Sequence, residues 1–455
     1  MEHYGMISLV PVICVVALAI ITKRTFEPLL IGSVIGFILL EKGGFFSAWL
    51  DAVYAVMMDA VTVWIILVCG LFGSLIALLE KSGGAMGFSG IAAKLTKSRG
   101  SSLVFTWILG IIVFVDDYLN ALAVGSAMRK VTDKFKVPRE LLAYVINSTG
   151  AVVCVLIPFS TWSAFMAGQM EANGVVVNGT GTGAYIAAIP FILYAWAAVL
   201  CVPLFALRII PAFGPMANAV KRAEELGETF PPSTAGKAKA LSEQEKELTV
   251  KPNVVDFVIP MLVLAAVTVY TKDMLWGVII AIVTCAVLYF PRRLMSFGEF
   301  FDSFMNGFKE MIPVLAIIVA AFFLQKANEG LGLTPYVIES VEPLLSGVFL
   351  PAVTFVIVAF LAFSTGSFWG VAAIAFPIIV PLAQSMDVNL LLASGAIISA
   401  ASFGSHSCFY GDAVTLSCVS SQIENIDYAR TVIPLIMVPA VLGIVLFLIF
   451  GFLMG

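Results

Sequence analysis

The sequence predicts an all-α polytopic membrane protein, and its composition, its apolar runs and its basic residues support this class. The chain has 455 residues, of which 60% are hydrophobic and only 12% are charged. A soluble globular domain carries about twice that charged fraction. Long apolar runs recur from one end to the other, as expected for helices that cross a bilayer. The short alternating segments of a transmembrane β-barrel do not occur.

Ten apolar runs read as spanning helices. They lie at about 6–22, 26–41, 61–79, 140–168, 184–207, 253–270, 274–290, 309–325, 389–418 and 431–454. Two further apolar segments are interrupted by polar residues, one at 102–128 and one at 347–386. We expect these two segments to be re-entrant hairpins. The predicted fold therefore has about 10 spanning helices and two hairpins.

The basic residues favour the hairpins. If 102–128 crossed the membrane, the basic cluster at 129–139 would lie on the opposite side from Lys23 and Arg24. That would violate the rule that Lys and Arg collect in cytoplasmic loops, whereas a hairpin keeps the cluster inside. With 347–386 entering from the other side, all but three of the 25 Lys and Arg are cytoplasmic. The three exceptions are Lys42, Lys272 and Lys326.

This topology implies an inverted repeat, which is a common plan of secondary transporters. Residues 1–207 hold three spans, a hairpin and two spans, and residues 253–455 hold the same series in the opposite orientation. Residues 208–252 form a polar cytoplasmic linker, expected to be mobile apart from a short helix near 217–226. No Lys or Arg lies between Lys326 and Arg430, so the second hairpin is placed by symmetry.

Three Asp residues lie in apolar stretches: Asp116, Asp117 and Asp412. A carboxylate at the bilayer centre costs roughly 2.5–3.5 kcal/mol on insertion scales, so its presence indicates cation binding or a proton relay. Asp116 and Asp117 would point about 100° apart on a helix, so one can bind an ion while the other caps the return helix. The alternative is that both cap the helix and pair with Arg129 or Lys130. Asp412 acts either as an ion ligand or as an N-cap.

Irregular backbone is expected at the two hairpin tips and at polar breaks within two spans, which would give discontinuous helices at mid-membrane. The breaks are NSTG (147–150) with PFSTW (158–162), and SFGSHS (402–407) with YGDAVT (410–415). Carbonyl ends of half-helices attract cations, and amide ends attract anions. His406 either titrates near neutral pH or makes a structural hydrogen bond.

The second tip, at 364–367, is rich in hydroxyl groups and suits either substrate contact or a plain turn. Trp162 and Trp369 adjoin the polar breaks and either shape a cavity or simply pack.

Two sets of motifs resemble the NhaC family of Na⁺/H⁺ antiporters. The stretch FVDDYLNALAVGSAMRKVTDKFKVPRELLAYVINSTG, followed by IPFSTW, resembles the first-half core of that family. STGSFWG, FGSHSCFYGDAVTLS and IDYARTVIPL resemble the second-half core, in the same order and spacing. The resemblance covers most of 100–165 and 360–435. It implies the ion transporter superfamily, with two re-entrant hairpins, an elevator-like motion and a place in the cell (inner) membrane.

The resemblance also implies a set of ion- or substrate-binding residues. The matching positions are Asp116, Asp117, Asn120, Ser160, Thr161, Thr365, Gly366, Ser367, His406 and Asp412. Two more positions, Asn147 and Ser405, stand where the family usually has Asp. Na⁺ would be held by Asp117 and Asp412.

Two functions remain open from the sequence. The first is Na⁺/H⁺ antiport by alternating access, which the motifs favour. The second is a Na⁺- or H⁺-coupled transporter of an amino acid or carboxylate, which the two missing carboxylates favour. An enzyme is not expected, because no nucleophile–base or metal set occurs, and no cofactor is expected beyond the coupling Na⁺ or H⁺. The expected partners are the lipid bilayer, a small ion or organic solute and a second copy in a homodimer, with no nucleic acid.

Overall fold

The computed structural model is helical throughout the part of the chain that it describes. That part comprises residues 3–22, 24–114, 117–158, 160–236, 253–271, 273–341, 347–366 and 368–454. Within it, the only β-type pairing is an isolated bridge between Val177 and Thr180. The predicted all-α class is confirmed.

Seven helices in the described ranges are long and apolar enough to cross a bilayer, or eight if one bent pair counts as a single span. They are Phe26–Met58, Thr62–Lys81, Phe297–Gly330, Gly347–Thr365, Phe368–Ser385, Leu390–Ser407 and Ile433–Met454. Four shorter apolar helices are Gly5–Ala19, Arg99–Ile112, Val255–Thr268 and Met274–Tyr289. The protein is therefore a multi-pass membrane protein, and the number of about ten spans stays a prediction.

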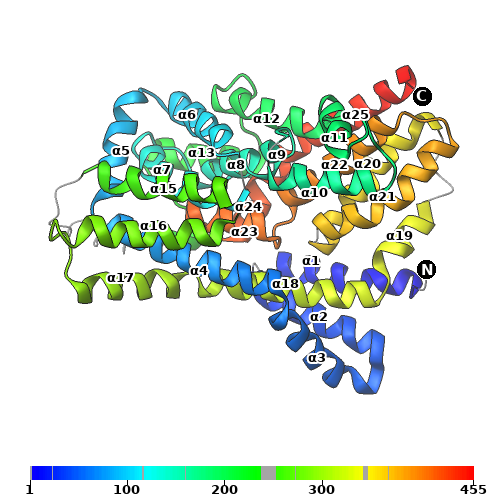
Figure 1. Ribbon diagram of the computed structural model, residues 1–455, viewed down its shortest axis with the longest axis horizontal. Coiled ribbons are helices and arrows are strands. Elements are labelled where there is room, and N and C mark those ends of the chain that lie inside the picture. Colours follow the sequence, from blue (N-terminus) through cyan, green and yellow to red (C-terminus); the bar gives the residue numbers. More distant parts are fainter. Residues whose placement is uncertain are drawn as a thin grey trace.

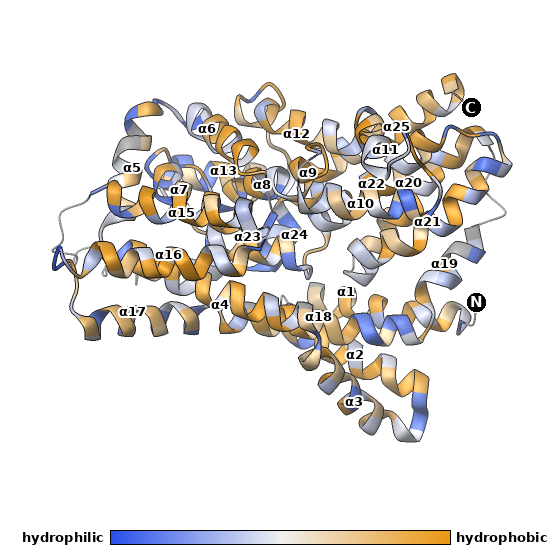
Figure 2. Ribbon diagram, viewed as in Figure 1, coloured by the Kyte–Doolittle hydropathy of each residue, from blue (hydrophilic) through white to orange (hydrophobic). Residues whose placement is uncertain are grey.

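Long helices form one edge of the molecule. α4 (Ala60–Lys81) packs against α16 (Met274–Tyr289) and α17 (Phe297–Glu310), and α2 (Phe26–Glu41) packs against α18 (Ile312–Gly330). Figure 1 shows α4, α17 and α18 along the same edge, with α2 projecting from it. α4 and α16 are largely apolar along their length (Figure 2), as expected of helices in contact with lipid.

The other helices of this region are shorter or lie beside the long ones. They are η1 (Gly5–Leu9), α1 (Val10–Thr22), η2 (Lys42–Gly44), α3 (Phe45–Met58), α5 (Gly84–Leu95), α15 (Val255–Thr271) and α19 (Leu333–Val341).

Helices from both halves of the chain meet at the centre. The first half supplies α6 (Arg99–Ile112), α7 (Asp117–Lys134), α8 (Arg139–Thr149), α9 (Ala151–Cys154), α10 (Thr161–Ala172) and α12 (Leu193–Ala206). The second half supplies η6 (Gly347–Phe349), α20 (Leu350–Thr365), α21 (Phe368–Ser385), α22 (Leu390–Ser407), α23 (Asp412–Ser421) and α25 (Ile433–Met454). α7 and α8 pack against α23, α9 packs against α22, and α12 packs against α25.

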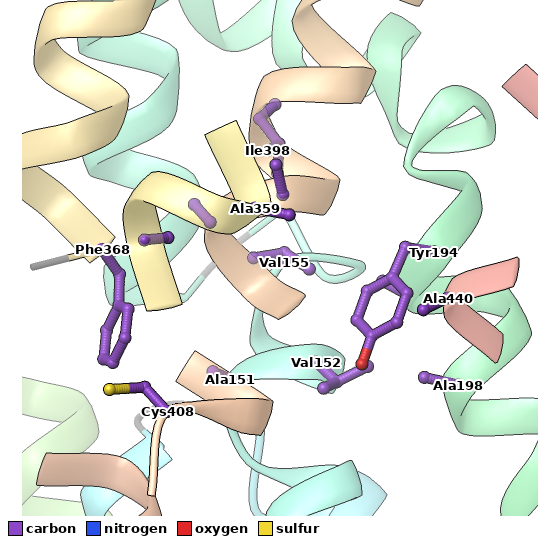
Figure 3. Packing of buried hydrophobic residues seen from close by; sticks show 14 of the residues in the cluster. Ala151, Val152, Val155, Tyr194, Ala198, Ala359, Phe368, Ile398, Cys408 and Ala440 are labelled. Carbon is purple, nitrogen blue, oxygen red and sulfur yellow. The ribbon is translucent and has the colours of Figure 1, made fainter. Parts of the chain in front are cut away.

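Small and branched apolar side chains fill the space between these central helices. Figure 3 shows Ala151 and Val152 of α9 near Tyr194 of α12, with Ala359 of α20 and Ile398 of α22 in the same buried cluster. All five side chains are at most 5% exposed. The polar breaks are thus held inside a closely packed apolar core.

The two segments predicted as hairpins are each a pair of packed helices. α6 packs against α7, and α20 packs against α21. α20 ends at Thr365, and the Gly366 that follows has a φ of 67°, a left-handed conformation that glycine adopts without strain. The predicted interruptions are confirmed, although residues 115–116 and 367 lie outside the described part. Whether each pair turns back within the bilayer stays a prediction, because α20 (with η6) and α21 are each long enough to span it.

The break predicted within 140–168 is confirmed. α8 ends at Thr149, α9 begins after Gly150, and α10 begins at Thr161.

The break predicted within 389–418 is also confirmed, since the chain leaves the helix at 408–411 and α23 begins at Asp412. Its predicted SFGSHS part is wrong, because α22 remains helical through Ser407. Gly404 does not break the helix; it allows close packing. A Cβ on Gly404 would lie 2.3 Å from the Ala362 Cβ of α20. The missing side chain thus permits close contact between α20 and α22.

The span predicted at 184–207 is a bent pair of helices. α11 (Gly181–Ala188) with η3 (Ile189–Phe191) forms a 51° bend with α12. Pro190 lies in the first turn of η3, and Ile192, just before α12, has non-helical angles of φ −80° and ψ 63°. Proline has no amide hydrogen, so Pro190 cannot donate to a carbonyl of the preceding turn, which weakens the helix at this bend.

The described part of the linker packs onto the central helices. It contains α13 (Gly214–Leu226) and η4 (Pro232–Thr234), and α13 contacts α8 and α24 (Asn425–Thr431). The helix expected near 217–226 is confirmed. Residues 237–252 lie outside the described part.

Polar contacts hold this segment in place. Arg222 donates two hydrogen bonds of 2.9 Å to the carboxylate of Glu140, and the Ser233 hydroxyl donates to Asp427 Oδ2. The Arg139 guanidinium lies 4.4 Å from the centre of the Phe230 ring. Residues 208–236 are therefore a docked segment, in contrast to the mobile linker expected from composition.

Candidate functional site

Asp412 is the first residue of α23 and is half-buried. Its Oδ1 accepts a hydrogen bond of 2.7 Å from the Ala413 amide, and its Oδ2 accepts one from the Tyr118 hydroxyl. The amides at the start of a helix stabilise a carboxylate in this position. Because each carboxylate oxygen has two lone pairs, both oxygens retain capacity for a cation or a proton.

Asp117 is the first residue of α7, which packs along α23. Its side chain is buried, and a Cβ built on Gly150 would lie 3.7 Å from the Asp117 Cβ. Asp117 therefore lies beside the break between α8 and α9. Asp116 lies outside the described residues. Asp117 and Asp412 thus occupy the same position, the first residue, in two neighbouring helices.

Asn120 joins the carbonyl ends of two helices. Its side-chain amide donates to the carbonyls of Gly110 at 2.6 Å, Val113 at 3.0 Å and Thr149 at 2.9 Å. Carbonyls at the end of a helix have no partner within it, so a buried donor there stabilises both α6 and α8. Asn120 is fully buried one turn after Asp117, and its predicted role as an ion ligand stays a prediction.

We expect Asn120→Ala to lower the free energy of unfolding by about 2–3 kcal/mol, because buried carbonyls lose their donor at about 1–3 kcal/mol each. The measurement is SDS-induced unfolding in mixed micelles. Asn218→Ala, an exposed asparagine on α13, is the control and should change stability by less than about 0.5 kcal/mol. Equal stability of Asn120→Ala and wild type would contradict this role.

Asn147 and His406 belong to one buried network. The Asn147 amide donates to the His406 carbonyl at 2.9 Å and to the Tyr428 hydroxyl at 2.6 Å. His406 Nε2 lies 2.9 Å from the Ser148 hydroxyl, and its Nδ1 lies 2.8 Å from the Tyr194 hydroxyl. These contacts connect α8 and α12 of the first half with α22 and α24 of the second.

The hydroxyl directions fit a neutral His406 ring with its proton on Nε2. Ser148 donates its hydroxyl hydrogen to the Tyr144 carbonyl at 2.6 Å, so it accepts from Nε2. The Tyr194 hydroxyl then donates to Nδ1. His406 therefore makes the structural hydrogen bonds that were one of its two predicted roles. Ser405 lies next to it on α22, and its buried hydroxyl has no hydrogen-bond partner within the described residues.

Ser160 is the N-cap of α10. Its hydroxyl accepts from the Ser163 amide at 3.0 Å and donates to the Cys154 carbonyl at 2.6 Å, so it closes the break on both sides. Thr161 is the first residue of α10, and its side chain lies outside the described part. Trp162 follows it and is fully buried.

Aromatic side chains fill the region between α10 and the second tip. The Trp162 ring lies 4.6 Å from that of Trp369 and 6.5 Å from that of Phe368, centre to centre. Trp162 and Trp369 were predicted either to shape a cavity or to pack, and these contacts support packing.

The second tip is held by Tyr410, which lies in the break before α23. The Tyr410 hydroxyl donates to the carbonyls of Phe363 at 2.7 Å and Ser364 at 2.9 Å. The Thr365 hydroxyl donates to the Leu361 carbonyl at 2.8 Å. A Cβ on Gly366 would lie 3.4 Å from the Tyr410 ring. Ser367 lies outside the described residues.

The described residues contain no group of three or more His, Cys, Asp or Glu side chains that could hold a metal ion. A Na⁺ ion bound by Asp117 or Asp412 would therefore need carbonyl, hydroxyl or water oxygens as further ligands.

Four tyrosines that were not predicted from the sequence complete this region. They are Tyr118, Tyr194, Tyr410 and Tyr428. The sequence gives only a weak indication of them: Tyr118 follows the two Asp residues, and Tyr410 lies in a polar break.

Comparisons with known proteins identify the family. Residues 175–452 match the model of the Na⁺/H⁺ antiporter family. The chain is 29% identical, over 469 aligned residues, to an uncharacterized protein of Haemophilus influenzae, covering 94% of this chain and 87% of that protein. It is 25% identical over 174 residues to a malate-2H⁺/Na⁺-lactate antiporter of Bacillus subtilis, covering 37% of this chain and 36% of that protein.

The matched residues include the second-half motifs around His406 and Asp412, whereas the first-half motifs at 100–165 precede them. Because the match covers more than half of the chain, this protein belongs to the Na⁺/H⁺ antiporter family, a family of membrane transporters and not of enzymes.

Proposed function

We propose that this protein exchanges Na⁺ for H⁺ across the membrane at a site formed by Asp117 of α7 and Asp412 of α23. The observation that carries the proposal is the hydrogen bond from Tyr118 to Asp412. Because Tyr118 directly follows Asp117, this bond joins the first turns of the two helices. Two intramembrane carboxylates then lie at adjoining helix ends, where the backbone amides of the first turn stabilise their negative charge.

The chemistry of antiport follows from competition at these carboxylates. A carboxylate oxygen that binds Na⁺ cannot hold a proton on the same lone pair, so the arrival of one ion releases the other. The backbone is irregular at the nearby break at Gly150, and carbonyl oxygens at such a break can complete the ligands of a hard cation. Alternating exposure of this site to the two sides of the membrane would then couple the two ion gradients.

We also propose that residues 1–207 and 253–455 are inverted repeats joined by a cytoplasmic linker at 208–252. The helix contacts support this, because many come in pairs related by exchanging the two halves. The corresponding contacts are α6–α8 with α20–α22, α7–α8 with α21–α22, α6–α12 with α20–α25, and α2–α18 with α16–α4. The re-entrant hairpins and the elevator-like motion fit this arrangement, and the homodimer stays a prediction.

A second candidate is the exchange of an organic carboxylate. Asn147 and Ser405 stand at positions that would carry Asp in the antiporter motif, and fewer fixed charges weaken cation binding. The partial similarity to a malate-2H⁺/Na⁺-lactate antiporter favours the same alternative.

Transport by the purified protein in proteoliposomes tests the proposal. We expect an inward Na⁺ gradient to drive protons out of the vesicles, as reported by an internal pH dye, with no organic solute present. Vesicles without protein control for leakage. Absence of Na⁺-driven proton movement, together with malate- or lactate-dependent flux, would refute the proposed function in favour of the second candidate.

A further inference from the structure

Tyr118 connects the candidate site with the long helices at the edge of the molecule. Its hydroxyl donates to Asp412 Oδ2, and its ring centre lies 6.0 Å from that of Trp64 on α4. Trp64 Nε1 in turn donates at 2.8 Å to Asp273, the N-cap of α16. Continuous contacts therefore run from α16 through α4 and α7 to the carboxylate on α23.

The carboxylates at the two ends of this series of contacts, Asp273 and Asp412, each accept a second hydrogen bond from a backbone amide. Asp273 Oδ1 also accepts from the Leu275 amide at 2.9 Å, which holds the carboxylate at the start of α16. Asp412 Oδ1 accepts from the Ala413 amide within α23, whereas Oδ2 accepts from Tyr118 of α7. The direction of Oδ2 thus depends on the position of the Tyr118 ring, which packs against Trp64.

We propose that Tyr118 is a positioning residue for Asp412, which holds the carboxylate in the orientation that binds Na⁺. The inference rests on the proposed function and deepens it. A hydrogen bond donated to a carboxylate fixes its direction as well as contributing energy. Without the Tyr118 hydroxyl, the carboxylate turns more freely, so Na⁺ must reach a higher concentration to bind.

The other titratable groups near this end of α23 are few in the described part of the chain. Asp117 lies on α7, the Cys408 thiol lies in the break before α23, and His406 lies on α22, where it bonds to Ser148 and Tyr194. Within the described part of the chain, the Tyr118 hydroxyl donates to the Asp412 side chain, so its removal tests the idea.

Tyr118→Phe removes only the hydroxyl and keeps the ring against Trp64. In proteoliposomes at pH 7, we expect the KM for Na⁺ to rise about tenfold, which is the size of one hydrogen bond to a charged group. We expect kcat to stay within about twofold of wild type. A purely structural role would lower kcat or stability and leave the KM for Na⁺ unchanged.

Tyr270→Phe is the matched control, because Tyr270 is 90% exposed at the end of α15. Its KM and kcat should equal those of wild type. A wild-type protein with Na⁺-driven proton flux and a Tyr118→Phe variant with unchanged KM would overturn this inference alone. A wild-type protein without such flux would overturn the proposed function and this inference with it.

Discussion

Asp412→Asn is expected to abolish Na⁺-driven proton flux while leaving the fold intact. The amide has the size of the carboxylate and can still accept from the Ala413 amide, so the start of α23 is preserved. It has no negative charge and cannot carry a proton. A charge–cation contact at 4 Å is worth about 4 kcal/mol at an effective dielectric constant of 20, so the rate should fall by about a hundredfold or more. The proteoliposome assay with the internal pH dye measures this.

The control is Asp387→Asn. Asp387 is an exposed residue in the turn after α21, with a φ of 58° that asparagine also tolerates. This variant should transport like wild type. An unfolding temperature of Asp412→Asn equal to that of wild type would show that the variant keeps its fold. Retention of more than about half of the wild-type rate by Asp412→Asn would remove Asp412 from the mechanism.

Arg222→Ala is expected to be the most destabilising change in the docked linker. Glu140, at the start of α8, has a side chain that is only 2% exposed, and Arg222 of α13 is its ion-pair partner. Removing one partner of a buried pair leaves an uncompensated charge, which costs about 3–5 kcal/mol. SDS-induced unfolding in mixed micelles measures the loss.

Two further variants separate this effect from a loss of surface charge. Lys221→Ala removes the neighbouring base on α13, whose contact with Glu225 is exposed on both sides, and should cost less than about 0.5 kcal/mol. Arg222→Ala combined with Glu140→Gln should recover part of the lost stability, because the buried charge is gone. If the double variant is as unstable as Arg222→Ala alone, the buried charge is not the cause.

Polar and small residues in an apolar run predict that a helix is interrupted nearby, but they do not show which residue ends it. The irregular backbone after Thr149 was predicted because polar and small residues interrupt an apolar run. The same reasoning failed at SFGSHS, because Gly404 serves contact between α20 and α22 and the chain leaves the helix only after Ser407. Composition cannot separate a glycine that ends a helix from one that allows two helices to approach, since the difference lies in the neighbouring helix.

The sequence likewise indicated which polar residues are candidates for the site, but not which groups they contact. Asp117 and Asp412 were selected because a carboxylate in an apolar stretch is costly, and both lie at the first residue of neighbouring helices. Asn120 was selected as an ion ligand, yet its amide donates to the carbonyl ends of α6 and α8. Its partners are 7 to 29 residues away in the chain, so no local pattern shows them.

The amino-acid sequence alone determined that this chain is a helical membrane protein, that it carries carboxylates in apolar segments, and that it resembles Na⁺/H⁺ antiporters. These follow from local properties, namely hydropathy, charge and short motifs. Only the tertiary structure brought Tyr118 to Asp412, which is 294 residues away, and Arg222 to Glu140. Such contacts depend on how helices from the two halves pack, and packing is decided by the shapes of surfaces that are distant in the chain.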